Sequence, residues 1–585
     1  MADYTNFYVD YALDNNDAQN DATMTATEYK PMSRIDLLPE GTEATKFISQ
    51  EHNYVVLDGT YTDTPGSIAF ISEEMSDENG LFTDNPTITA TFTRQHKSFM
   101  LTFKFVEDAP TKVRVCWWLD SEIIYGMTQE WDGNETTCTV THAIEAFDKL
   151  TIEFMQALPK RYIKLNRIEF GTTLHWDETI VKSATLVKGL NRLSDMLSID
   201  TLNIELVDTS NIMNFANPMG VHTMFKRDQA MYPIEILQDE GRAPETLPLG
   251  KFFLDTFTTE GNIGRISAYS YMGILDRIPY NGGGVYNGTL ASVVLADIFA
   301  AAGLSAGDYS IDSETANQQL YGVIKPTTCR EALRQVLFAC NSIVNTSHEQ
   351  HIKVSKYSTG VIKDITRHNK TSTKVSSIEF VSGVKLSYTT YSLGSESTQI
   401  TSGVFSVGSH TVSFDKPYTG LTITGGTIES SDAFSVTFSS DGTTTITVSG
   451  TPYEETSSYV ALNKEVVSGE VENVIEYSTT LCNMDTATEL AEKLLDYHKN
   501  NLRLQIQHYA SNVTMDNSRF VENPNSDLDG FIAMFESRSI DLTGGFFDSA
   551  TMVGKYDVSD RYYYAGKKNA EDSIVELYAG EDGIV

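Results

Sequence analysis

Strand alternation is clearest in residues 99–105, whose sequence is Phe-Met-Leu-Thr-Phe-Lys-Phe. A large apolar side chain occupies every second position, which is the pattern of a strand with one buried face. Working outward, residues 87–92 and 112–117 alternate in the same way, and the turn-forming Asp-Gly-Asn of residues 132–134 separates such runs. Because the runs are short, closely spaced and linked by turns, they predict a β-sandwich.

The sandwich is expected over residues 46–160, a region that holds three of the four tryptophans of the chain. Trp117, Trp118 and Trp131, together with Tyr125, are candidates for a face on which sugar rings stack. The alternative is that these aromatic side chains pack the core and rim of the sandwich. We therefore predict an accessory, jelly-roll-like domain at 46–160 and keep both interpretations of its aromatic residues.

The segments on either side of the sandwich have different patterns. Residues 1–45 are polar and carry no Lys or Arg before Lys30, which predicts an extended acidic arm. Long alternating strands over residues 161–285 predict an antiparallel barrel. The last segment, residues 551–585, has no strong pattern.

Residues 286–360 predict a small α+β unit with two helices. Thr289 is the expected N-cap of the first helix, which ends at Gly303. Its expected apolar positions are Leu290, Val293, Val294, Ile298 and Ala301. The second helix begins at a capping box from Thr328 to Glu331. Its apolar stripe is Leu333, Val336, Leu337 and Cys340.

Strands return in residues 361–395 and resume in 470–550, where Asp485 or Thr486 is expected to cap a helix over 485–500. Between them, residues 396–468 are rich in Ser, Thr and Gly and poor in Lys and Arg, so they predict a small inserted β domain. Gly442 is expected to close a hairpin in that domain. The fold class that follows is mainly β and multidomain.

Charge and targeting signals limit what the chain can bind. Of its 585 residues, 43 are Lys or Arg and 79 are Asp or Glu, which gives a net charge of −36. Such a chain lacks the basic face that nucleic acids and anionic membranes require. The N-terminus has no basic region followed by an apolar run, so no signal peptide is expected, and no apolar stretch is long enough for a membrane anchor.

The search for chemistry finds no motif of an enzyme or a metal site. The histidines of residues 348–351 lie three apart instead of the four that a helical zinc motif needs. The glycines of residues 281–284 are not followed by the Lys-Ser/Thr of a phosphate loop. The five cysteines form no Cys-x-x-Cys pair, and pairing of Cys116 with Cys138 stays open. We expect no catalytic, metal or cofactor-binding residues.

An ordered set of segments, more than any single motif, resembles one protein family. The segments are residues 161–171, 247–255, 326–340, 485–497 and 540–546. Their order and spacing resemble the tail-tip or baseplate hub proteins of tailed bacteriophages and of phage-derived tail particles. The resemblance covers about 160–395 and 470–550.

The resemblance implies a homotrimer in which each subunit gives two hub β-barrels to a ring that continues the tail tube. The first hub barrel is residues 161–285, and the second is 361–395 with 470–550. The α+β unit at 286–360 braces them from outside. The implied partners are the tail tube, the distal tail protein, the tape-measure protein and fibre or spike proteins, and the implied place is the tail tip of the virion. Its acidic charge suits a channel through which DNA passes without sequence-specific binding.

Three functions follow as hypotheses. The leading one is a structural hub that closes the tail tube and gates the passage of DNA or tape-measure protein. The second is a tail protein that binds host-surface polysaccharide through the domain at 46–160. The third is a tail-associated peptidoglycan hydrolase, which we rank last because the sequence ends soon after the region of hub resemblance.

Overall fold

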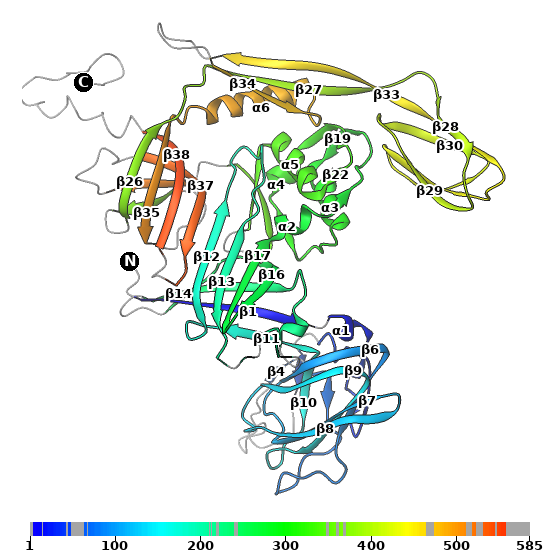
Figure 1. The fold of residues 1–585 in the computed structure, drawn as a ribbon, viewed down its shortest axis with the longest axis vertical. Coiled ribbons are helices and arrows are strands. Elements are labelled where there is room, and N and C mark those ends of the chain that lie inside the picture. Colours follow the sequence, from blue (N-terminus) through cyan, green and yellow to red (C-terminus); the bar gives the residue numbers. More distant parts are fainter. Residues whose placement is uncertain are drawn as a thin grey trace, which may run out of the picture.

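The computed structural model describes residues 4–14, 16–41, 45–47, 64–66, 68–209, 211, 213–217, 221–238, 244–346, 350–357, 362–366, 370–463, 473–509, 517–521, 531–543 and 547–556. Strands predominate among them, so the mainly β fold class predicted from the sequence is confirmed. Figure 1 shows four parts: a sandwich at the bottom, a large sheet, a helical unit beside it, and a long β arm that ends in a small domain.

The large sheet has fourteen strands, with the main order β11-β1-β14-β16-β17-β13-β12-β37-β38-β35-β26. The first half contains β1 (Tyr4–Asp14), β11 (Gly171–Trp176), β12 (Val181–Gly189), β13 (Thr201–Val207), β14 (Ala230–Gln238), β15 (Glu245–Pro248), β16 (Phe252–Glu260) and β17 (Ile263–Ser270). The second half contains β25 (Ile362–Thr366), β26 (Lys370–Ser377), β35 (Leu502–Tyr509), β36 (Asn517–Val521), β37 (Phe531–Asp541) and β38 (Phe547–Tyr556).

The two halves come from the two segments that the sequence predicted as separate barrels. They are joined where β12 pairs antiparallel with β37, from Thr185 opposite Asp541 to Gly189 opposite Ser537. We call this pairing the seam. Because the ladder of hydrogen bonds runs through it, the two segments form one continuous sheet.

The N-terminal segment differs from the acidic arm expected at 1–45. Its first described residues form β1, which pairs with both β11 and β14. Phe7, Val9 and Tyr11 are fully buried in the sheet. These apolar residues alternate with polar ones, so β1 has the period of a half-buried strand within an acidic composition.

The sandwich lies between β1 and β11 in the sequence. These two strands are antiparallel neighbours, and Asp14 at the end of β1 lies opposite Gly171 at the start of β11. The elements of the sandwich are α1 (Asn16–Asp21), β2 (Thr23–Thr27), β5 (Phe70–Ile71), β6 (Thr87–Phe105), β7 (Lys112–Leu119), β8 (Glu122–Glu130), β9 (Thr137–Gln156) and β10 (Lys164–Glu169). The order is β5-β10-β6-β9-β7-β8, with β2 paired to β6, and β8 is an edge strand. A short separate pair joins β3 (Thr45–Phe47) to β4 (Thr64–Gly66).

Two contacts hold the N-terminal segment on the sandwich. The carboxylate of Asp21 accepts hydrogen bonds from the backbone and side chain of Thr93 and contacts His96 Nε2 at 2.7 Å. The Gln19 amide nitrogen donates to the Ile168 carbonyl at 2.8 Å, and its oxygen accepts from the Phe170 backbone. The hydrogen bonds from Thr93 and His96 lower the pKa of the Asp21 carboxyl to about 2.

The helical unit contains α2 (Tyr271–Leu275), α3 (Ala291–Ala301), α4 (Ser313–Ala316), α5 (Cys329–Cys340) and seven short strands. These strands are β18 (Pro279–Tyr280), β19 (Tyr286–Leu290), β20 (Tyr309–Ile311), β21 (Gln319–Gly322), β22 (Thr327–Thr328), β23 (Ser342–Asn345) and β24 (Ile352–Lys356). Helix α6 (Met484–Tyr497) packs on the same core.

The predicted helices form, with corrections to two of them. In α5 the Thr328 hydroxyl accepts from Glu331 N, and the expected stripe is buried, but the Glu331 carboxylate accepts from Arg334 and Gln335, so the capping box is only half formed. In α3, however, Leu290 is the N-cap residue, and Leu290, Val293 and Ala301 are exposed. Helix α6 is capped by Asn483, which forms a capping box with Thr486. The expected cap position was therefore late by two or three residues.

The β arm begins as a ribbon of β27 (Gly383–Leu393) and β33 (Thr445–Asn463), with β34 (Val474–Thr479) beside β27. The inserted domain at its end contains β28 (Thr398–Val404), β29 (Gly408–Ser413), β30 (Tyr418–Thr424), β31 (Thr427–Ser431) and β32 (Ser435–Ser440). The hairpin expected at Gly442 is absent, because β32 and β33 belong to different sheets. The core of the inserted domain consists of five buried residues, which are Phe414, Val436, Phe438, Ile446 and Val448.

Candidate functional site: the seam of the large sheet

One face of the large sheet carries mostly uncharged polar side chains around the seam. Cross-strand registers align Val187, Ser539, Ser549 and Gln507 in one row, and Gly189, Ser537, Thr551 and Gln505 in the next. We call this surface the polar face. Gly189 belongs to this surface but adds no side chain to it. The side chains of the polar face are Ser267, Asn203, Thr185, Val187, Ser537, Ser539, Asp541, Ser549, Thr551, Gln505 and Gln507. These side chains are exposed or half-buried.

The opposite face carries buried charges at the same seam. Lys188 lies directly opposite Arg538, although both are cations. Arg538 donates to Asp548 through Nε at 2.6 Å and Nη2 at 2.5 Å, and His508 Nε2 lies 3.2 Å from the same carboxylate. All four side chains are almost completely buried. Together with Asp200 they form the charged layer.

Electrostatics within the charged layer are set by burial and by close charges. Burial raises the pKa of Asp548, but the charge of Arg538 and the hydrogen bonds from His508 and Arg538 outweigh it and leave that pKa lowered. Burial lowers the pKa of Lys188 to about 7, against the attraction of Asp200. Burial raises the pKa of Asp200. Lys188 Nζ also donates to the Leu249 carbonyl at 2.6 Å.

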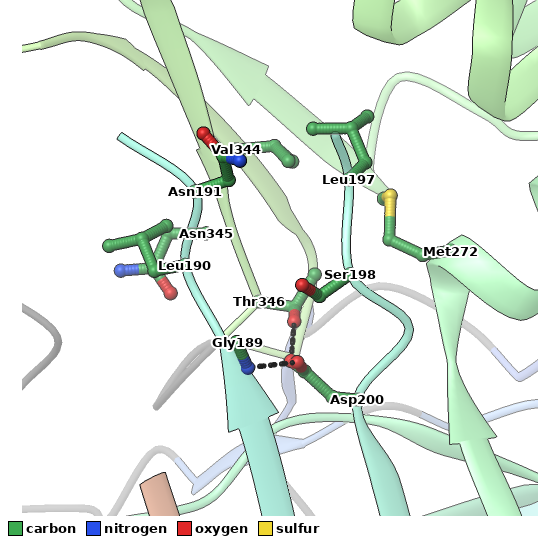
Figure 2. Close-up of a pocket in the computed structure, with 10 residues that line it drawn as sticks. All are labelled: Gly189, Leu190, Asn191, Leu197, Ser198, Asp200, Met272, Val344, Asn345 and Thr346. Atoms are coloured by element: carbon green, nitrogen blue, oxygen red, sulfur yellow. Dashed lines mark hydrogen bonds between the residues drawn. The ribbon is translucent and has the colours of Figure 1, made fainter. Parts of the chain in front are cut away.

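Figure 2 shows how Asp200 closes the end of the seam. Its carboxylate accepts from Gly189 N at 3.0 Å and from Thr346 Oγ1 at 3.0 Å, so it joins β12 to the segment that follows β23. The cavity beside it has a volume of about 20 Å³. A space of this size accommodates about one water molecule, so this site is structural in character.

The charged layer separates two apolar cores. Leu186 and Ile540 belong to the core of the first half. Ile506, Ala550 and Met552 belong to a second, smaller core. Charged side chains thus lie where the strands of the two halves meet, and each must find its partner for the seam to form.

The predicted sugar-stacking residues lie in different environments. Trp117 is fully buried, so its role in stacking on a ligand is corrected to core packing. Trp131 is half-buried against Phe103 and Phe105, at ring distances of 5.7 Å and 6.0 Å. Trp118 donates to Thr151 Oγ1 at 3.1 Å. Lys149 Nζ covers the Trp118 ring at 4.5 Å.

Tyr125 is the most accessible of the four predicted aromatic residues. It lies on the edge strand β8, is 37% exposed, and stacks parallel to His142 with ring centroids 3.6 Å apart. Ile123 and Ile124 on the same strand are also exposed. The structure therefore leaves a small aromatic and aliphatic patch at this edge and does not bring the four residues together into one platform.

The remaining sequence motifs were also located. Residues 348–349 of the His-Glu-Gln-His segment lie outside the described residues. Within the described ranges, no group of three His, Cys, Asp or Glu side chains is placed to hold a metal ion. The five cysteines are buried free thiols. In the same part of the chain, no helix has both the length and the apolar surface to cross a membrane.

The seam was not predicted, although one signal for Lys188 exists in the sequence. Ala184, Leu186 and Lys188 occupy alternate positions of β12, and the first two are buried in a core. A lysine at the next inward position indicates a buried charge that needs a partner. The sequence alone does not reveal that this partner layer comes from strands more than 300 residues away.

Comparison with known proteins used families, curated sequences and solved structures. No family model and no curated protein matches. The chain does resemble solved structures. One is a tail protein from Neisseria meningitidis that is 8% identical, with a TM-score of 0.39, and the similarity covers 64% of this chain and 92% of that one. A 43 kDa tail protein of prophage MuSo2 from Shewanella oneidensis has 9% identity, coverages of 65% and 94%, and a TM-score of 0.35.

A third similar structure is an Escherichia coli component of the type VI secretion system that is described as similar to the phage T4 tail proteins gp27 and gp5. It has 8% identity, coverages of 65% and 74%, and a TM-score of 0.32. Phage tail proteins and hub-type proteins of secretion systems are therefore among the structural neighbours of this chain. These are the classes of protein that the ordered segments of the sequence resemble.

Proposed function

We propose that the chain is a structural hub of a phage tail or phage-derived tail particle. Three copies close the tail tube, join it to distal tail or baseplate proteins, and gate the passage of DNA or tape-measure protein. The observation that carries the proposal is the large sheet itself, in which the two resembling segments form one continuous surface with a largely polar face. We assign the polar face to the wall of the channel.

A wall of hydroxyl and amide groups suits the passage of a polyanion. Specific and non-specific DNA binding both depend on Lys and Arg at the phosphates. The polar face presents mostly Ser, Thr, Asn and Gln. The carboxylate of nearby Glu205 forms ion pairs with Arg265 Nε at 2.9 Å and with Lys182 Nζ at 3.1 Å. The same face also carries exposed Lys374, opposite Gln505, and Arg503, which lies 3.7 Å from Glu536. The net charge of −36 of the chain adds long-range repulsion of DNA.

Packing at one end of the large sheet supports a bracing role for the helical unit. Phe253 and Tyr269 of the large sheet share a core with Leu295, Leu333 and other helix residues. Figure 1 shows α2 to α5 beside β16 and β17. Tyr269 lies two residues from Ser267 on the same strand, so this packing braces the sheet at one end of the polar face and leaves the part around the seam available for the channel.

The oligomeric state tests the proposal. Light scattering of the purified full chain, alone and with the tail-tube and distal tail proteins, should give a mass near three chains in at least one mixture. Negative-stain images of that sample should show rings. A chain that stays monomeric in every mixture overturns the proposal. A trimer without a central opening also contradicts it.

A second candidate function is binding of host-surface polysaccharide by the sandwich. The observation that favours it is the exposed Tyr125 ring stacked on His142 beside Ile123. Pull-down of the full chain with host cell-wall fractions tests it. We expect Tyr125→Ala to lose this binding, whereas Trp131→Phe, which keeps the packing on Phe103, should retain it.

A further inference from the structure

A groove lies between the helical unit and the inserted domain, away from the large sheet. One wall consists of residues 282–285 and Asp297 of α3, and the other consists of residues 418–421, residues 431–433 and Tyr453. Its volume is about 560 Å³. This lies within the range of pockets that hold small ligands, roughly 300–1,000 Å³.

An apolar contact beside the groove holds its two walls together. Phe434 of the inserted domain is 1% exposed and forms a small buried cluster with Val323 and Ala433. Val285 and Tyr391 pack against this cluster. A Cβ atom added to Gly282 would lie 3.5 Å from the Phe434 ring, so the glycine loop contacts the inserted domain directly. The groove is therefore part of the packed structure.

The glycine loop has both structural and open positions. Gly282 has a φ of +86°, and a Cβ there would lie 2.6 Å from the Ile324 carbonyl oxygen. A Cβ on Gly283 would lie 2.5 Å from the Tyr286 hydroxyl. At Gly284, by contrast, a Cβ would meet nothing within 4 Å, and the same holds for Gly420 on the opposite wall. These two positions leave backbone groups accessible from the groove.

The chemistry of the lining excludes anions. No Lys or Arg lines the groove, so a phosphate or sulfate would find no charge-assisted partner. Asp297 Oδ2 accepts from the Tyr280 hydroxyl at 2.7 Å. Asp432 accepts from Phe434 N at 2.7 Å and Ser435 Oγ at 2.8 Å. Both carboxylates are thus held in place, and each oxygen has capacity for another donor.

We propose that this groove binds a neutral oligosaccharide. The half-buried Tyr418 and Tyr453 supply aromatic rings that cover the C–H faces of sugar rings, with hydroxyls at their tips. Asp297 and Asp432 accept hydrogen bonds from sugar hydroxyls, which are donors without a charge. The site would give the proposed hub an adhesive function. Its residues lie outside the polar face that we assign to the channel.

The test uses the full chain and calorimetric titration with neutral tetrasaccharides of glucose, galactose, mannose and N-acetylglucosamine, and with a lysine-rich peptide. We expect at least one tetrasaccharide to bind. Tyr453→Ala and Gly284→Trp should each weaken that binding by about tenfold or more. Tyr459→Ala is the matched control, because Tyr459 lies on the same strand, outside the groove, and is 64% exposed.

Thermal melts of the variants keep the result interpretable. Gly284→Trp adds its side chain to open space, so its melting temperature should stay near that of the parent chain. Failure of all four tetrasaccharides to bind overturns the proposal, as does binding that Gly284→Trp and Tyr453→Ala leave unchanged. Binding of the lysine-rich peptide alone also overturns it. The mass of the complex in solution reports on the hub proposal separately, and Tyr125→Ala reports on the sandwich.

Discussion

Two joints in this molecule are built in opposite ways. The seam pairs only residues 185–189 with 537–541, whereas the ribbon pairs the whole of β27 with residues 453–463. Yet the seam buries Lys188, Arg538 and Asp548 completely or nearly so, and the outer part of the ribbon is exposed. The shorter pairing therefore buries the charged side chains that must find partners, and the longer pairing leaves its outer side chains in solvent.

The difference also concerns register. A slip of one residue at the seam would turn Val187 inward and expose Lys188, so that Arg538 would lose its place in the charged layer. At the outer ribbon most side chains meet solvent, and the apolar contact at Phe434 and the ion pair of Lys325 with Glu455 at 3.5 Å hold this part against the helical unit. The seam specifies one arrangement through buried charged partners, whereas the outer ribbon is held by these few contacts.

The largest expected effect comes from Asp548→Ala. The variant leaves the Arg538 charge buried without its carboxylate, which costs about 3–5 kcal/mol of unfolding free energy. Urea denaturation of the full chain measures it. Ser549→Ala, at the next residue but on the polar face, is the control and should change stability by no more than about 0.5 kcal/mol. Equal effects of the two would show that the charged layer does not stabilise the seam.

The next effect concerns the ribbon. Phe434→Ala removes a buried ring and should cost about 3 kcal/mol at the contact between the inserted domain and the helical unit. Because that contact is local, amide hydrogen exchange should rise in residues 383–393 and 453–463 while protection of the seam stays unchanged. Val407→Ala, at a residue of the inserted domain that is 77% exposed, is the control. Faster exchange across the seam as well would contradict the separation of the two joints.

A smaller effect, on pH dependence, comes from Lys188→Met. In the folded chain the pKa of Lys188 is lowered to about 7, whereas an unfolded lysine keeps its ordinary value. Between these values the unfolded state binds the proton and the folded state does not, so stability rises with pH by up to about 1.4 kcal/mol per unit. The variant should lose this slope when urea midpoints are compared at pH 7, 8 and 9. Identical slopes would refute the assignment.

The smallest effect is expected on the polar face. Val187→Thr exchanges one exposed β-branched residue for another and should change the unfolding free energy by no more than about 0.5 kcal/mol. It should also leave the mass of the oligomer unchanged. A large loss of stability in urea denaturation would mean that this face is packed against something, which would contradict its assignment to an open channel.

Local patterns explain which parts of the fold the sequence predicted. The stripe of α5 and the N-cap at Thr328 depend on residues a few positions apart; the stripe is found as expected, and Thr328 caps the helix without the second half of the predicted capping box. In α3 nearly every position is apolar, so periodicity did not distinguish buried Leu295 from exposed Val293. The acidic composition of the N-terminus concealed β1, whose burial depends on neighbours from residues 171–176 and 231–238.

The candidate site was harder to predict than the fold class. Lys188 and Arg538 meet only because β12 pairs with β37, and no local signal encodes a register between strands so far apart. In the sandwich, the number of aromatic residues suggested a sugar-stacking face that includes Trp117. Trp117 is an inward-facing residue of a strand with buried Val113 and Val115, and that alternation predicts burial more reliably than the residue type does.

The position of the sandwich between β1 and β11 has an evolutionary consequence. Asp14 and Gly171 lie opposite each other at the ends of neighbouring antiparallel strands, so everything from residue 15 to residue 170 occupies the place of a hairpin turn. An entire module can be acquired, lost or exchanged there by recombination without altering any other strand order in the large sheet. We expect a chain with a two-residue Asn-Gly turn in place of the module to keep the seam and its oligomeric state, which makes this turn a natural point for exchanging modules between lineages.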